Sequence, residues 1–168
     1  MQEKELGLAA LFDKKTQNIF AGYYNILRQN GFIGNQPKDV PYHLTLKNGI
    51  GSDKQLISNI ERICSETDCF DINLAYIGLF GLKVLFIAPN MNFELLKLQQ
   101  NLFPDCGNGY HTWAAHATLL MDEPEIILKA LPIVAENFVP FKAKIESVVL
   151  YEYFPVRLIK EYRLNSAE

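Results

Sequence analysis

Two short segments of the chain carry the same arrangement of a histidine and a threonine. The first is His-Leu-Thr-Leu at His43–Leu46, and the second is His-Ala-Thr-Leu at His116–Leu119. The chain contains only three histidines, so two of them lie in this four-residue pattern. Successive side chains of a β-strand point to opposite faces. Each segment therefore predicts a strand with a polar His-Thr face and an apolar face toward a core.

These two pairs of side chains suit the cleavage of a phosphodiester if they share one cleft. In-line displacement at phosphorus requires a base for the attacking oxygen and an acid for the leaving oxygen. Histidine, with an ordinary pKa of about 6.5, can do either near neutral pH, and threonine hydroxyls can donate to the non-bridging oxygens. We interpret His43 and His116 as candidate acid and base, and Thr45 and Thr118 as candidate phosphate-binding residues. This chemistry requires no metal ion.

Either segment taken alone also has a purely structural explanation. A histidine in a strand is often half-buried with one satisfied hydrogen bond, and threonine is common in strands. The duplication argues against that explanation, because the second motif follows the first by 73 residues. The same offset relates Ser52 to Glu125, and both positions are predicted helix starts. The repeat favours one site built from two halves.

Length and composition describe an ordinary globular protein. The 168 residues are 49% hydrophobic and 21% charged, with a formal net charge of −3, which is typical of a folded domain and argues against disorder. The sequence pI of about 5.6 argues against a large surface for long nucleic acids, which would require clustered lysine and arginine. A small pocket for one phosphate or a nucleotide end remains compatible with this charge.

The elements that must position the motifs follow from periodicity and capping signals. Strands are predicted at 5–12, 43–46, 69–79, 83–88, 116–120, 141–153 and 157–164, and helices are predicted after Asp13, after Ser52, after Asn90 or Asn92, and after Asp122. The order is βαβαβ twice, followed by a hairpin. We therefore predict an α+β fold of one domain, residues 1–168, with halves of about 1–80 and 81–168. Mostly antiparallel sheets would flank a central cleft, with the helices outside.

The two motifs and their context resemble those of the 2H phosphoesterase superfamily, which includes RNA 2′,5′-ligase-like proteins and 2′,3′-cyclic nucleotide phosphodiesterases. Its members carry two His-x-Thr/Ser-hydrophobic motifs in a bilobal α+β fold. The chain has Trp113 at an aromatic position of the second motif, but Ala115 where proline is usual. The resemblance implies a hydrolase that acts on a 2′,3′-cyclic phosphate or a 2′,5′ linkage without a covalent intermediate. It implies acid and base roles for His43 and His116.

Other residues near the motifs are weaker candidates for binding a substrate. Tyr110 and Trp113 precede the second motif and could stack on a base, as could Phe12 and either Tyr151 or Tyr153 near strand ends. Packing in the core is the alternative for each of these aromatic residues. Lys47 alternates onto the face of the first motif and could contact phosphate, although a surface lysine at a strand end is the more common case.

Cysteine usage predicts a protein without a metal centre. Cys64, Cys69 and Cys106 are odd in number and form no Cys-x-x-Cys pair, which favours reduced thiols and a cytoplasmic location. The spacing of Cys106, His111 and His116 matches no standard zinc site. The N-terminus lacks the features of a signal peptide, and the longest apolar stretch is interrupted by polar residues and glycine. We expect no cofactor, no metal and no membrane association.

Three functions are compatible with the duplicated motif. The leading hypothesis is a metal-independent cyclic phosphodiesterase whose partner is a small nucleotide or an RNA end with a cyclic phosphate. The same cleft could instead bind a nucleotide or an RNA end without turnover. A third hypothesis is RNA 2′,5′ ligation, the reverse reaction. The sequence predicts neither the physiological substrate nor the oligomeric state.

Overall fold

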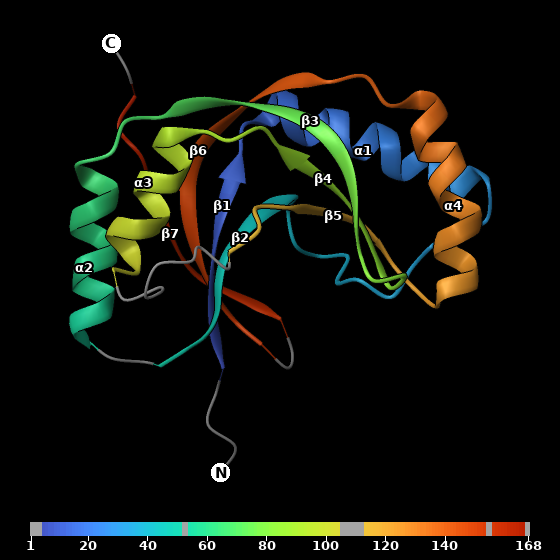
Figure 1. Ribbon diagram of the computed structural model, residues 1–168. Coiled ribbons are helices and arrows are strands. Elements are labelled where there is room, and N and C mark those ends of the chain that lie inside the picture. The colour runs from blue at the N-terminus through green and yellow to red at the C-terminus, as the bar shows by residue number, and fades with distance from the viewer. Residues whose placement is uncertain (1–4, 52–53, 105–112, 154–155, 167–168) are drawn as a thin grey trace.

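The computed structural model describes residues 5–51, 54–104, 113–153 and 156–166 (Figure 1). The elements of these residues are β1 (Leu6–Phe12), α1 (Lys14–Gln29), β2 (His43–Ile50), α2 (Lys54–Ser65), β3 (Phe70–Phe80), β4 (Val84–Pro89), α3 (Phe93–Leu102), β5 (Ala117–Met121), α4 (Pro124–Asn137), β6 (Phe141–Glu152) and β7 (Arg157–Arg163). The predicted α+β class, the element order and the C-terminal hairpin are confirmed.

All named strands belong to one antiparallel sheet, in the order β2-β1-β6-β3-β4-β5, with β7 paired to β6. The centre of the sheet is the pairing of residues 70–74 of β3 with residues 141–145 of β6. Beyond this pairing the two strands separate. β6 continues beside β1, while β3 continues beside β4. The sheet thereby divides into a first wing, β2-β1-β6-β7, and a second wing, β3-β4-β5.

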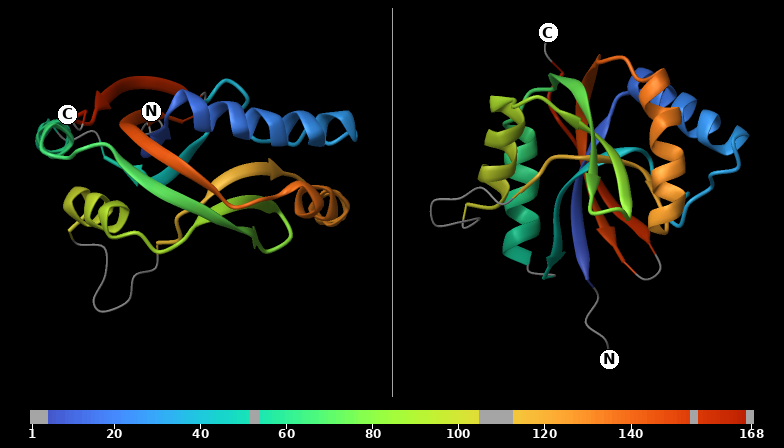
Figure 2. Two further views of the ribbon diagram at one scale, coloured as in Figure 1. Left: turned by 90° about the horizontal axis from the view of Figure 1, so that it is seen from above. Right: turned by 45° about the vertical axis from the view of Figure 1, so that its right-hand side comes forward.

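The third strand of each repeat lies in the wing of the other repeat. β3 follows β1 and β2 along the chain but pairs with β4, and β6 follows β4 and β5 but pairs with β1. The helices also pack across the repeats, since α1 contacts α4 and α2 contacts α3 (Figure 2). Each wing and each helix pair therefore combines the two repeats, which fixes the orientation of one repeat relative to the other.

Helix boundaries follow from local capping. Asp13 Oδ1 accepts a hydrogen bond from the backbone N–H of Thr16 at 2.9 Å, and Asn92 Oδ1 accepts one from Leu95 at 2.8 Å. Both caps satisfy N–H groups that have no partner within the helix. α4 begins with Pro124 at its first turn and runs unbroken through Pro132. The predicted cap at Ser52 lies outside the described residues.

The centre of the first wing, where β1 pairs with the second half of β6, is buried on both faces. Every residue of β1 is buried, and alternate residues belong to two different clusters. Leu8 and Ala10 face the main core beneath the helices. Ala9 and Leu11 pack on the opposite face with Val149. This opposite face is the side on which the histidines lie, so the floor beneath them is rigid and apolar.

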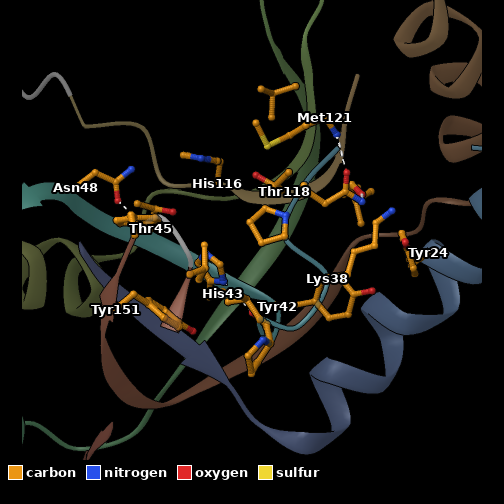
Figure 3. Close-up of a pocket in the computed structure, with 18 of the residues that line it drawn as sticks. Tyr24, Lys38, Tyr42, His43, Thr45, Asn48, His116, Thr118, Met121 and Tyr151 are labelled. Atoms are coloured by element: carbon orange, nitrogen blue, oxygen red, sulfur yellow. Dashed lines mark hydrogen bonds between the residues drawn. The ribbon is translucent and has the colours of Figure 1, made fainter. Parts of the chain in front are cut away.

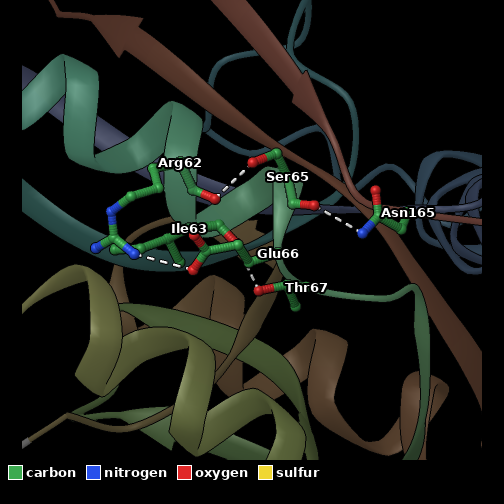
Figure 4. Close-up of polar contacts among 6 residues, drawn as sticks. All are labelled: Arg62, Ile63, Ser65, Glu66, Thr67 and Asn165. Carbon is green, nitrogen blue, oxygen red and sulfur yellow. Dashed lines mark hydrogen bonds and ion pairs between the residues drawn. The ribbon is translucent and has the colours of Figure 1, made fainter.

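The connection from α2 to β3, which carries the chain from one wing to the other, is anchored to the C-terminal segment (Figure 4). Asn165 Nδ2 donates to the carbonyl oxygen of Ser65 at 2.7 Å, and its backbone N–H donates to Thr67 O at 2.9 Å. Thr67 Oγ1 in turn donates to Ile63 O at 2.7 Å. These bonds fix the point at which β3 starts its path toward β6.

The α1–β2 segment, residues 30–42, links the two wings. The backbone N–H of Asn35 donates to Met121 O at 2.6 Å. Gln36 Oε1 accepts from the N–H of Met121 at 3.0 Å, and its Nε2 donates to Leu119 O at 3.3 Å. The segment therefore covers the free edge of β5 while it leads into β2.

In the described ranges, none of the helices has the length and apolar content needed to cross a membrane.

A pair of glycine variants tests the conformation of this segment. Gly31 and Gly34 both have positive φ, 85° and 72°. A Cβ at Gly31 would meet nothing within 4 Å, whereas a Cβ at Gly34 would lie 2.6 Å from Leu120 Cδ1 and would displace the Gln36 carboxamide. We expect Gly31→Ala to lower the free energy of unfolding by about 1–2 kcal/mol and Gly34→Ala to lower it by roughly 1–3 kcal/mol more. Equal losses in urea denaturation would contradict the contacts of Gly34.

Candidate active site

The two His-Thr pairs lie in one cavity of about 460 Å³. β2 and β5 are the end strands of the sheet path and contact each other. The curvature of the sheet brings these strands together, and Figure 3 shows the labelled His43, Thr45, His116 and Thr118 side by side in the cavity. The structure thus unites the four residues that the motifs singled out.

The two histidines make equivalent hydrogen bonds. His43 Nδ1 lies 2.7 Å from the carbonyl oxygen of Pro41, and His116 Nδ1 lies 2.8 Å from that of Ala114. Because a carbonyl oxygen only accepts, Nδ1 carries the proton in each ring. The other nitrogen, Nε2, is then the basic atom of the neutral imidazole. Both rings are therefore held in the tautomer in which Nε2 can accept or return a proton.

Burial alters the proton affinity of both rings. Desolvation lowers the pKa of His43, and the nearby His116 lowers it further, while the hydrogen bond to Pro41 opposes the shift. Desolvation also lowers the pKa of His116, against the hydrogen bond to Ala114. A positive charge on His116 therefore disfavours protonation of His43. The neutral form of each ring is favoured at pH 7.

The position of His43 depends on a clamp from α1. Gln17 Nε2 donates to the carbonyl oxygen of Tyr42 at 2.7 Å, and Gln17 Oε1 accepts from the N–H of Tyr42 at 2.9 Å. The Tyr42 ring stacks on Phe20 with centroids 5.1 Å apart, and burial raises its pKa to about 12. The residue before the first histidine is therefore fixed by both backbone and side chain.

The position of His116 depends on aromatic rings of the second wing. Phe80 meets the imidazole edge to face, with centroids 4.6 Å apart and an interplanar angle of 84°. Phe86 lies 5.4 Å from the same imidazole centroid. The Phe86 ring occupies the space over Gly78, where a Cβ would collide with the ring. The glycine is required here because a side chain at Gly78 would take the space of the ring that contacts the histidine.

The two strands share an irregularity directly after each motif. The register of β2 against β1 shifts by one residue at Leu46, and that of β5 against β4 shifts by one residue at Leu119. Such a bulge interrupts the alternation of faces along a strand. Asn48, rather than Lys47, consequently lines the cavity. The prediction that Lys47 shares the face of the first motif is therefore wrong, because it depended on regular alternation through this point.

Lys47 is exposed and lies outside the set of residues that line the cavity. Its Nζ is 4.8 Å from the ring centroid of Phe103, so the ammonium covers a core aromatic ring at the end of α3. The lysine that does line the cavity is Lys38, from the α1–β2 segment, whose Nζ donates to Gly34 O at 3.1 Å. No pattern in the sequence indicated Lys38, because a loop position has no predictable face.

The aromatic candidates separate into three groups. Tyr151 lines the cavity, with its ring centroid 5.8 Å from that of His43. Phe12 is 4% exposed and belongs to the core. Trp113 packs against the core and its Nε1 donates to the Thr45 carbonyl oxygen at 2.9 Å. Of the two interpretations for Phe12 and Trp113, the structure agrees with packing in the core, because both rings pack against the main core cluster and neither lines the cavity. Tyr110 lies outside the described residues.

The charge of the cavity favours an anion. Its lining residues in the described part of the chain include Lys38 and two histidines but no carboxylate. Among the same residues, no three histidine, cysteine or acidic side chains gather in a way that could hold a metal ion. Cys106 and His111, whose spacing with His116 matches no standard zinc site, lie outside the described residues. The described cavity offers two proton-transfer groups, two threonine hydroxyls and one cation to a small anionic ligand.

Comparisons with known proteins place this geometry in a family. The model of the 2′-5′ RNA ligase superfamily matches residues 27–154. The chain belongs to this superfamily. The resemblance to the 2H phosphoesterases is thereby confirmed, and membership supports a phosphoesterase-type function. No match was found among curated protein sequences.

Solved structures of similar proteins share the fold of this superfamily member. Escherichia coli LigT in apo form is 18% identical, with a TM-score of 0.65 over 96% of this chain and 98% of that chain. The protein TT0787 of Thermus thermophilus is also 18% identical, with a TM-score of 0.65 over 98% and 100% of the two chains. E. coli LigT complexed with 3′-AMP gives 17% identity and a TM-score of 0.64 over 96% and 98%. Identities this low show the fold alone.

The lowered pKa values predict how stability depends on pH. At pH values between the lowered pKa of each histidine in the folded chain and the ordinary value of 6.5, the unfolded chain binds more protons than the folded chain. The free energy of unfolding should therefore rise with pH through this window and fall as the histidines are protonated. Urea denaturation across pH 5–8 measures the slope, and the variant with both His43→Gln and His116→Gln should reduce it. NMR titration midpoints at or above 6.5 for both rings would contradict the burial effect.

Proposed function

We propose that this protein is a metal-independent phosphoesterase that cleaves a 2′,3′-cyclic phosphate or a 2′,5′-linked phosphodiester, on an RNA end or a small nucleotide. Its two histidines act as general acid and general base, and its two motif threonines bind the phosphate. The observation that carries the proposal is that His43 and His116, each held in the same tautomer by a backbone carbonyl, line one cavity together with Thr45 and Thr118.

The proposed reaction assigns one proton transfer to each histidine. One imidazole, neutral, accepts a proton at Nε2 from a water molecule as the water oxygen attacks phosphorus. The other, protonated, donates its Nε2 proton to the ribose oxygen that leaves, and the P–O bond to that oxygen breaks. A phosphomonoester and a free hydroxyl result, and the proton balance is closed by exchange between the two rings and solvent. The reverse reaction exchanges the two roles.

The threonine hydroxyls complete the phosphate site. Both can donate a hydrogen bond to a non-bridging oxygen, where negative charge increases as the nucleophile adds. Lys38 adds a positive charge to the cavity, and the absence of carboxylates from its described lining avoids repulsion of the phosphate. Because two imidazoles supply both proton transfers, the mechanism requires no metal ion.

Two further observations support a small nucleotide as the substrate. A cavity of about 460 Å³ lies in the range of about 300–1,000 Å³ that is usual for small-molecule sites. Solved structures of E. coli LigT, which shares the fold, contain 3′-AMP or ATP. The net charge of −3 does not favour a long RNA partner.

A cytoplasmic location is part of the proposal, in line with Cys64 and Cys69, which are free thiols.

Replacement of either histidine tests the mechanism directly. We expect His43→Ala and His116→Ala each to lower kcat on adenosine 2′,3′-cyclic phosphate by about 10²–10⁴-fold, with a metal chelator present throughout. The wild type should show a bell-shaped pH profile of kcat, because one ring must be neutral and the other protonated. Lys47→Ala is the matched control and should retain wild-type activity, since Lys47 lies outside the cavity. Full activity in either histidine variant would refute the two-histidine mechanism.

Replacement of the threonine hydroxyls tests the phosphate site. Thr45→Val and Thr118→Val keep the shape of the side chain and remove one donor each. We expect each to lower kcat by about 10–10³-fold and to weaken competitive inhibition by inorganic phosphate. Unchanged inhibition in both variants would show that the phosphate lies elsewhere.

Binding and turnover measured together separate the proposal from its alternatives. Calorimetry with nucleoside monophosphates reports binding, and hydrolysis of cyclic and 2′,5′-linked substrates reports chemistry. Tight binding without turnover of any such substrate would indicate a nucleotide-binding module in place of an enzyme. Net formation of a 2′,5′ linkage from separate RNA ends would indicate a ligase.

A further inference from the structure

The offset of 73 residues that relates the two motifs also relates two other pairs of cavity residues. Asn48 corresponds to Met121, and Phe80 corresponds to Tyr153. All four line the cavity. Figure 3 shows Asn48 and Met121 on opposite sides, with the labelled histidines and threonines between them. The centre of the cavity is therefore nearly symmetric in chemistry, whereas its two ends are not.

The end formed by the first wing is polar and preorganised. Tyr153 Oη donates to Asn48 Oδ1 at 2.8 Å. This pair lies directly over Gly7, where a Cβ would be 2.6 Å from Tyr153 Cε2 and 2.9 Å from Asn48 Oδ1. The strands β1, β2 and β6 thus combine to hold one carboxamide in place. Three features are needed for this arrangement: the absent side chain of Gly7, the bulge at Leu46 and the tyrosine hydroxyl.

The orientation of the Asn48 carboxamide decides what it can recognise. Its oxygen is occupied by Tyr153, so the Nδ2 group remains with two N–H donors and no acceptor. Within the described residues, Nδ2 has no hydrogen-bond partner, and Asn48 is exposed. This end of the cavity therefore offers donors to an oxygen of the ligand and opposes a ligand donor.

The end formed by the second wing is apolar at the same two positions. Phe80 is 40% exposed and Met121 is 38% exposed, although both are large hydrophobic residues. The Phe80 ring packs against Phe86, with centroids 4.4 Å apart, and makes a T-shaped contact with the His116 ring, with centroids 4.6 Å apart. A supported aromatic ring with exposed area beside a phosphate site is suited to stacking on a nucleobase, and a methionine adapts to such a flat surface.

A symmetric pair of motifs could bind a phosphate in two orientations with the same contacts. The unequal ends remove this equivalence, because an apolar ring gains most against Phe80 and an oxygen gains most against Asn48. We propose that the cavity binds its nucleotide in one direction. The nucleobase packs against Phe80 and Met121, and an oxygen at the phosphate end of the nucleotide accepts a hydrogen bond from the Asn48 carboxamide. This inference rests on the proposed nucleotide ligand. Tyr153 is then a positioning residue, which acts through Asn48.

Binding of two probes by three variants tests the direction without any need for turnover. The probes are adenosine 3′-monophosphate and inorganic phosphate, measured by calorimetry. Phe80→Leu should weaken binding of the nucleotide about 10–100-fold and binding of inorganic phosphate much less, because only the nucleotide carries a base, whereas phosphate is affected only through the contact of Phe80 with His116. Asn48→Asp keeps the acceptor for Tyr153 but replaces the donors with a negative charge, so it should weaken both probes by at least about tenfold. Tyr153→Phe should weaken both probes by a smaller, equal factor.

A second measurement locates the base directly. With the methyl group of Met121 labelled with ¹³C, intermolecular nuclear Overhauser effects from the adenine H2 and H8 protons should reach this methyl group and the Phe80 ring. Nuclear Overhauser effects from the adenine protons to the Tyr153 ring, with none to Met121 and Phe80, would overturn the proposal. So would a Phe80→Leu variant whose affinity for inorganic phosphate falls as strongly as its affinity for the nucleotide. A wild-type protein that does not bind adenosine 3′-monophosphate also overturns it. Binding in the expected direction without turnover would instead refute only the proposed catalysis.

Discussion

The antiparallel pairing of residues 70–74 with residues 141–145 is the constraint on which the rest of the structure depends. It joins the third strand of one repeat to the third strand of the other, and both strands then continue into the opposite wing. Because each wing contains strands of both repeats, the two motifs cannot move apart without breaking the sheet. The catalytic geometry that we propose therefore depends on long-range backbone hydrogen bonds as much as on the histidines themselves.

The exchange of third strands between the two repeats also explains how a site can form where the two end strands of the sheet meet. β2 and β5 each have a neighbouring strand on one side only, and their other edges approach each other across the cavity. The α1–β2 segment covers part of the β5 edge through Gln36, and Trp113 reaches the backbone of β2 at Thr45. Edges that would otherwise expose unpaired backbone groups are used to build the site. The centre of the first wing, where β1 pairs with β6, is buried on both faces and provides the floor.

Much of the fold was predictable because its signals are local. The cap at Asp13, the helical spacing through Phe20, and the alternation along residues 141–146 each depend on neighbours in sequence. The choice of partner strands was not predictable, since the alternation along β3 indicates which of its side chains are buried but not which strand pairs with it. The position of Lys47 was predicted incorrectly for a related reason. A bulge is defined by pairing with the neighbouring strand, and no residue at Leu46 indicated this one in the sequence.

The chemistry of the centre was determined by the sequence itself, because two His-x-Thr-Leu motifs at a constant offset specify their faces through strand alternation alone. The offset also contained the correspondence of Asn48 with Met121 and of Phe80 with Tyr153. Its meaning required the tertiary structure, which showed that these residues line the same cavity and that Gly7 leaves room for one of the pairs. The local alternation of a strand thus decides which side chains share a face, whereas contacts between distant strands decide which of those side chains meet a ligand.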